Sequence, residues 1–68
     1  MKIRVNDEER VIQCNKSISL NETMKILGYS SNTVIVELND LIINAEGWKN
    51  KYIKEGDKLE IVSIVGGG

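Results

Sequence analysis

Apolar and polar residues alternate along MKIRV (residues 1–5) and TVIVEL (residues 33–38), the pattern of strands that bury one face. A turn signal at Asn39-Asp40 follows the second stretch, so LII at residues 41–43 is predicted to form a short strand. The last strand is predicted over Lys58–Val65. Because its second half is apolar on both faces, we expect this strand at the centre of a sheet.

Polar residues interrupt this pattern after the first predicted strand, at Asn6-Asp7-Glu8-Glu9. The chain is expected to turn there and to return antiparallel over Arg10–Cys14, which would form a hairpin. In one parity Ile12 and Cys14 face inward. Val11 is equally apolar, so the opposite parity stays open.

A capping box predicts where the helix begins: in Ser19-Leu20-Asn21-Glu22, Ser19 stands at the N-cap and Glu22 at position N3. Gly28 stands where a left-handed residue would end the helix, which gives it about two to three turns. Apolar side chains at i, i+4 and i+7 form a stripe that is expected to pack on the sheet: Leu20, Met24 and Leu27, with Ile26 beside them.

The order hairpin, helix, strand, short strand and last strand predicts an α+β fold in which a mixed sheet packs on one short helix. In this arrangement, the β-grasp or ubiquitin-like fold, the first and last strands lie side by side in the middle of the sheet. We assign residues 1–65 to this domain and residues 66–68 to a flexible C-terminal glycine tail. Trp48 and Tyr52, spaced i, i+4 in an irregular segment, are expected to close one end of the core.

The composition fits one small domain with an aliphatic core. Its 68 residues include no Phe, one Trp and two Tyr, and the many isoleucines favour strands. The net charge is −1, with basic and acidic residues interspersed, which argues against a nucleic-acid partner. The apolar runs are too short for a membrane helix, and one cysteine without an export signal makes the cytoplasm the expected compartment.

We do not expect catalysis within the folded body, so the chain is predicted not to be an enzyme. It contains no His, the commonest general base and metal ligand, and Cys14 is better explained as a small buried hydrophobe. Acidic residues such as Glu55, Asp57 and Glu60 are predicted on solvated turns and strand faces, without the spacing of a calcium loop. The sequence therefore predicts no catalytic residue, no metal site and no cofactor bound by this chain.

The end of the chain, IVSIVGGG, is the remaining candidate for chemistry. Gly66, Gly67 and Gly68 have no Cβ atoms, so they can thread a narrow channel with any φ that the channel imposes. Residues 64–68, fully extended, would reach about 17 Å into a partner's active site. A terminal carboxylate is ionised and inert as an electrophile at neutral pH. Gly68 therefore requires activation, typically as an acyl-adenylate, by a partner enzyme that supplies ATP and a metal.

Ordering three glycines costs about 3–6 kcal/mol, at about 1–2 kcal/mol per residue, so the folded body must supply docking energy. Ile35, Val62 and Ile64 are predicted to form an outward-facing apolar row on the last two long strands, flanked by Lys58 and Glu60. We predict that this row, the docking patch, binds the partner enzyme.

Several residues resemble the ThiS family, the ubiquitin-like sulfur carriers of thiamin biosynthesis: the terminal Gly-Gly, the Glu55-Gly56-Asp57 turn before Lys58-Leu59-Glu60-Ile61-Val62, the Asn39 turn and the Trp48 segment. The resemblance implies that a ThiF-like enzyme adenylates Gly68 while Gly66 and Gly67 thread into its active site. Sulfur from a cysteine desulfurase route would then convert Gly68 to a thiocarboxylate, and thiazole synthase would receive that sulfur.

Three other functions stay open from the residues alone. A MoaD-like carrier for molybdopterin synthesis would share the chemistry of the end. A protein modifier would have Gly68 joined to lysines of other proteins. A β-grasp interaction module would use no tail chemistry, and it alone would be unaffected by removal of Gly68.

Overall fold

The computed structural model describes residues 1–14 and 16–64. Along this part of the chain the elements are β1 (Lys2–Val5), β2 (Glu8–Val11), β3 (Ile18–Ser19), α1 (Leu20–Leu27), β4 (Val34–Leu38), β5 (Leu41–Ile43), the 3-10 turn η1 (Ala45–Gly47), β6 (Tyr52–Ile53) and β7 (Lys58–Ser63). The predicted tail at residues 66–68 lies outside the described residues, so the division of the chain after residue 65 stays a prediction.

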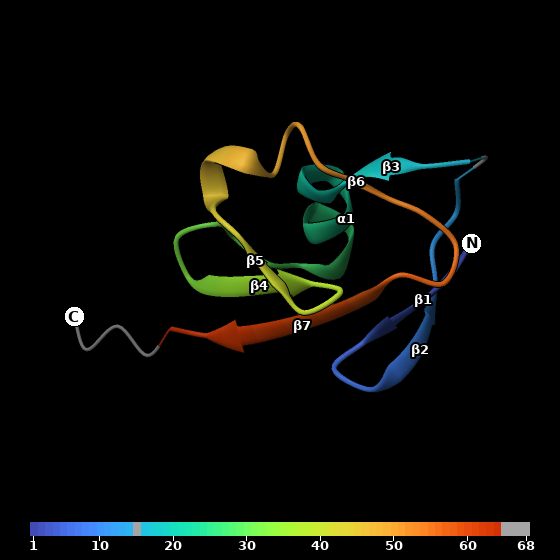
Figure 1. The fold of residues 1–68 in the computed structure, drawn as a ribbon, viewed down its shortest axis with the longest axis horizontal. Helices are drawn as coiled ribbons and strands as arrows, with labels where there is room; N and C mark the ends of the chain where they lie inside the picture. Colours follow the sequence, from blue (N-terminus) through green and yellow to red (C-terminus); the bar gives the residue numbers. More distant parts are fainter. Residues whose placement is uncertain (15, 65–68) are drawn as a thin grey trace.

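Five strands form one mixed sheet in the order β2-β1-β7-β4-β5. β7 is central: it pairs parallel with β1 on one side and antiparallel with β4 on the other. Figure 1 shows α1, η1 and the small β3–β6 ladder on one side of this sheet. The predicted β-grasp arrangement is therefore confirmed, including the neighbouring first and last strands and the central position of the last one.

The core lies between α1 and the inner face of the sheet. Its buried apolar side chains alternate along the strands, as the sequence pattern predicted: Ile3, Val5, Ile12, Leu20, Met24, Val34, Val36, Leu38, Trp48, Ile53, Leu59 and Ile61. Trp48 closes one end of this core, as predicted. The prediction for Tyr52 is wrong, because its side chain is 60 % exposed, and Ile26 is likewise 55 % exposed on the outer side of α1.

The hairpin is tighter than its sequence predicted. β2 covers Glu8–Val11 rather than Arg10–Cys14, and Val5 pairs directly with Glu8, so only Asn6 and Asp7 form the turn. Both turn residues have positive φ, 50° and 68°, which is the backbone of a two-residue hairpin turn. Glu8 and Glu9 therefore belong to an exposed edge strand, where polar side chains are no obstacle.

The predicted helix signals are confirmed at both ends. Ser19 caps α1, since its Oγ accepts a hydrogen bond from the backbone N–H of Glu22 at 3.1 Å. Gly28 ends the helix with φ of 90°, and its N–H donates to the carbonyl of Lys25. These caps fix a short helix over the sheet.

The structure differs from two further predictions, the burial of Cys14 and the end of the last strand. Cys14 is only half-buried, beside the sulfur of Met1 at 3.5 Å, because the strand that was expected to carry it ends at Val11. β7 ends at Ser63, and Val65 lies outside the described residues. Among the described residues, α1 is too short to cross a membrane, and no longer apolar helix is found.

Candidate docking surface and chain end

The predicted docking patch lies on the face of the sheet that points away from α1. Ile35 on β4 and Val62 on β7 are direct cross-strand partners, and their side chains are 45 % and 56 % exposed. Ile64 continues the alternation beyond β7 and is also exposed, while its N–H donates to the carbonyl of Thr33 at 2.8 Å. The structure therefore brings the three residues to one open face. Their binding of a partner stays a prediction.

Gly66, Gly67 and Gly68 lie outside the described residues, so the predicted adenylation site and threading segment have no geometry here. In the sequence they follow the end of β7 at Ser63 after two intervening residues, Ile64 and Val65. A partner that bound the docking patch would hold Ile64, which is only four residues before the terminal carboxylate.

Sequence reasoning missed one more exposed apolar residue on this face. Ile42 on β5 pairs with Glu37 on β4, so its side chain shares the face of Ile35, and it is 63 % exposed. The run Leu41-Ile42-Ile43 is apolar throughout and does not alternate, so its pattern does not indicate which residue faces outward. The open apolar surface thus extends across three neighbouring strands.

Carboxylates border this apolar surface. Glu37 and Glu60 are cross-strand partners, and together with Asp40 they place carboxylate oxygens within 4.8 Å of one another. Lys58 offsets part of this charge, because its Nζ lies 2.9 Å from Asp40 Oδ1 and 4.0 Å from Glu60 Oε1. The hydrogen bond to Asp40, aided by the charge of that carboxylate, raises the pKa of Lys58 above its ordinary value. The absence of a metal site stays a prediction.

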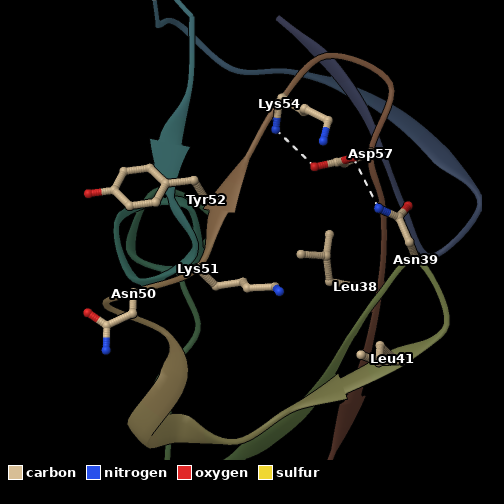
Figure 2. A pocket seen from close by; sticks show the side chains of 8 residues that line it. All are labelled: Leu38, Asn39, Leu41, Asn50, Lys51, Tyr52, Lys54 and Asp57. Atoms are coloured by element: carbon tan, nitrogen blue, oxygen red, sulfur yellow. Dashed lines mark hydrogen bonds between the residues drawn. The ribbon is translucent and has the colours of Figure 1, made fainter.

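Asp57 is not on a solvated turn, as the sequence suggested, but is 6 % exposed. Its Oδ1 accepts from Asn39 Nδ2 at 3.1 Å and its Oδ2 accepts from the backbone N–H of Lys54 at 2.9 Å, as the dashed lines in Figure 2 mark. Asn39 Oδ1 in turn accepts from the backbone N–H of Lys58 at 3.0 Å. This network ties the β4–β5 turn to the start of β7, the strand that carries Val62 of the docking patch and leads toward the chain end.

The comparisons with known proteins agree with this fold. The sequence profile of the ThiS family matches residues 3–68, the last of which is the terminal glycine. This chain belongs to the ThiS family. A solved structure of the thiamine biosynthesis protein ThiS from Geobacter metallireducens superposes with a TM-score of 0.85 at 28 % identity and covers 100 % of both chains.

Two curated proteins are also similar in sequence to this ThiS-family chain. It is 38 % identical over 68 residues to the uncharacterized protein ycf40 of Pyropia yezoensis, which covers 100 % of this chain and 93 % of that one. It is 37 % identical over 68 residues to a thiazole synthase of Paramagnetospirillum magneticum (strain ATCC 700264 / AMB-1), which covers 100 % of this chain and 20 % of the relative. Membership of the ThiS family supports the predicted role as a sulfur carrier rather than an enzyme.

Proposed function

We propose that this chain carries sulfur as a thiocarboxylate on Gly68 and donates it for formation of the thiamin thiazole. The observation that carries the proposal is that the ThiS profile matches through residue 68, so the likeness includes the glycine end as well as the folded body. The chain's own chemistry then lies in one group, the terminal carboxylate. The folded body serves to present it.

Activation requires a partner, since an ionised carboxylate does not react with nucleophiles. In the proposed sequence a ThiF-like enzyme, using its own ATP and metal, lets a carboxylate oxygen of Gly68 attack the α-phosphorus of ATP, and pyrophosphate leaves. A persulfide supplied through a cysteine desulfurase then attacks the glycyl carbonyl carbon with its terminal sulfur, and AMP leaves. A thiol of the partner proteins attacks the other sulfur of the resulting acyl persulfide, so the S–S bond breaks, a disulfide forms and the thiocarboxylate on Gly68 is released. Gly68 bears no side chain that would obstruct the attack on its carbonyl carbon.

The docking patch supplies the binding free energy that a tail without side chains cannot. Gly66 and Gly67 offer only backbone hydrogen bonds in return for the entropy that they lose on threading. Ile35 and Val62 form an exposed apolar pair close to the end of β7, and the acidic border formed by Glu37 and Glu60 lies beside them. We infer that the adenylating partner presents an apolar surface with a basic border to this face.

Thiazole synthase is the proposed acceptor of the sulfur. The support is the thiazole synthase of Paramagnetospirillum magneticum, a fifth of which matches this whole chain, so a segment like this one occurs within the polypeptide of such an enzyme. This likeness and the solved ThiS structure favour thiamin over molybdopterin as the pathway. The proposed setting is the cytoplasm, where the partner enzymes would have ATP and reduced sulfur donors.

The functional test is reconstituted thiazole formation with a ThiF-like enzyme, a cysteine desulfurase and thiazole synthase. Carrier lacking Gly68, or carrying it as an amide, should remain folded and should give no thiazole, because the reacting oxygen is displaced or absent. Full activity of either variant would instead assign the chain to interaction modules with an idle tail. Higher-mass conjugates of other proteins in the same mixture would point to a protein modifier.

A further inference from the structure

A hollow of about 480 Å³ lies on the helix side of the sheet, between β6 and the turn that joins β4 to β5. Its walls combine apolar, cationic and amide side chains, chiefly Leu38, Leu41, Lys51, Lys54, Asn39 and Asp57. Figure 2 shows the Lys51 side chain extending from one wall into the hollow toward Leu38 on the opposite wall. Neither the docking patch nor the glycine end belongs to this hollow.

The ammonium groups of Lys51 and Lys54 have no carboxylate within 4.0 Å in the described part of the chain, unlike those of Lys2, Lys25 and Lys58. Asp57 also lies in the wall, but it forms no ion pair with either ammonium group. Its two carboxylate oxygens accept hydrogen bonds from the Asn39 side chain and the Lys54 backbone. Two cations and one carboxylate leave the hollow with an excess of positive charge, although the whole chain has a net charge of −1.

We propose that this hollow binds a small organic anion, a carboxylate or phosphate ester, whose charged group pairs with Lys51 and Lys54 and whose carbon skeleton packs on Leu38 and Leu41. Leu41 is 63 % exposed, so an apolar ligand surface would remove it from water. Lys51 is the principal anchor, because it extends into the hollow from the wall opposite Asp57 (Figure 2). Lys54 contributes less, because the Asp57 carboxylate accepts from its backbone N–H and so places a negative charge near this residue.

The dimensions favour a small molecule over a protein segment. A volume of about 480 Å³ lies within the range of roughly 300–1,000 Å³ typical of small-molecule sites, which combine an apolar wall with a few polar groups. The hollow lies on the helix side of the sheet, near the start of β7, whereas Val62 of the docking patch points away from α1 and lies four residues along that strand, about 14 Å from its start. A ligand here would leave the docking patch open, so the site does not rest on the proposed sulfur chemistry.

The test is a titration of the ¹⁵N-labelled full chain, followed by amide chemical shifts, with phenyl phosphate and inorganic phosphate as probes at ionic strength matched with sodium chloride. Saturable shifts confined to residues 38–41 and 50–57 are expected, with phenyl phosphate binding more tightly because its ring packs on the leucines. Lys51→Gln should weaken phenyl phosphate by about tenfold, the effect of one lost charge-assisted hydrogen bond. Lys49→Gln is the matched control: Lys49 is exposed in the same segment but outside the hollow, so affinity should be unchanged.

Three results would overturn the proposal. The first is a set of shifts that rise linearly without saturation, or that spread over all lysine-bearing segments. The second is equal weakening by Lys49→Gln and Lys51→Gln, which would reveal general charge attraction. The third is saturable binding of a Glu-rich peptide at these residues without any binding of phenyl phosphate, which would assign the hollow to a protein partner.

Discussion

The docking patch can be tested by replacing its cross-strand pair with opposite charges, in the double variant Ile35→Asp with Val62→Lys. Ile35 and Val62 face each other directly on β4 and β7, so two aspartates would repel, whereas an Asp–Lys pair keeps the sheet register. Both residues are about half exposed, at 45 % and 56 %, so the fold retains most of its core when they are changed. The variant therefore separates partner binding from folding.

The expected loss follows from the area that a partner would cover. Burying a whole Ile or Val side chain is worth about 1.5–3 kcal/mol, so covering the exposed half of each contributes about 0.7–1.5 kcal/mol. The pair together contributes about 1.5–3 kcal/mol, which corresponds to a loss of affinity of about 10- to 150-fold. Desolvation of the new charges adds to this, so the estimate is a lower limit.

The assay is ATP–pyrophosphate exchange by a ThiF-like enzyme as a function of carrier concentration, with thermal unfolding followed in parallel. The double variant should raise the apparent KM for the carrier by at least about tenfold. Ile26→Lys is the matched control, because Ile26 is 55 % exposed but lies on α1, on the other side of the sheet. An unchanged KM in a folded double variant, or an equal rise with the control, would refute the assignment of the patch.

Three further predictions concern stability and charge. Asp57→Ala should lower the free energy of unfolding by about 1–3 kcal/mol in denaturant titrations, because it leaves buried hydrogen-bond donors without an acceptor; an unchanged midpoint would contradict the role given to the buried network. Gly28→Ala should lower the free energy of unfolding by about 1 kcal/mol in the same assay, and Gly28→Asn should lower it less. A Cβ atom at this position has open space, so only the positive φ is strained, and Asn tolerates positive φ better than Ala. Equal losses of stability would point to a steric cause instead. Asp40→Asn should lower the pKa of Lys58 in an NMR pH titration, because a neutral amide attracts the ammonium less; a pKa that stays raised would assign the shift to other carboxylates. In the unchanged chain the raised pKa makes this pair stabilising at neutral pH, and the contribution is lost as the pH rises through the pKa of Lys58 in the folded protein.

Most of the fold could be predicted because local signals agree with the tertiary structure. The alternation in β4 and the capping residue Ser19 each mark their element within a few neighbouring residues. β3 and β6 could not be found in this way, since strands of two residues have no periodicity. They form because the tertiary fold brings the segment just before α1 against residues 52–53, where the two short strands pair.

The errors in the hairpin and around Asp57 have different physical causes. Asn-Asp can adopt positive φ at both positions, which shortens the turn at residues 6–7, and the same dipeptide forms the turn at residues 39–40. Asp57 can be buried because Asn39 donates a hydrogen bond to its carboxylate. Asn39 lies 18 residues earlier in the sequence, and only the pairing of β4 with β7 brings the two residues together. The Asn-Asp dipeptide is thus a local sign of the short turn, whereas a local pattern carries no information about a hydrogen-bond partner 18 residues away.

Some residues of the candidate site could likewise be predicted from local patterns, and others could not. Ile35 and Val62 could be identified because strand alternation decides which side chains face outward. Ile42 could not, because its run is apolar throughout and the register with Glu37 determines its face. The lysine-lined hollow also escaped sequence reasoning, since its walls come from two separate segments, residues 38–41 and 50–57, that only the tertiary fold brings together.

Intact-mass spectrometry of the carrier after incubation with ATP, a ThiF-like enzyme and a cysteine desulfurase system tests the central claim most directly. The account predicts a mass increase equal to the replacement of one oxygen by sulfur, with fragmentation placing the change on Gly68 and no increase in carrier that lacks this residue. An unchanged mass with a demonstrably active enzyme, or sulfur found on Cys14 instead, would contradict it.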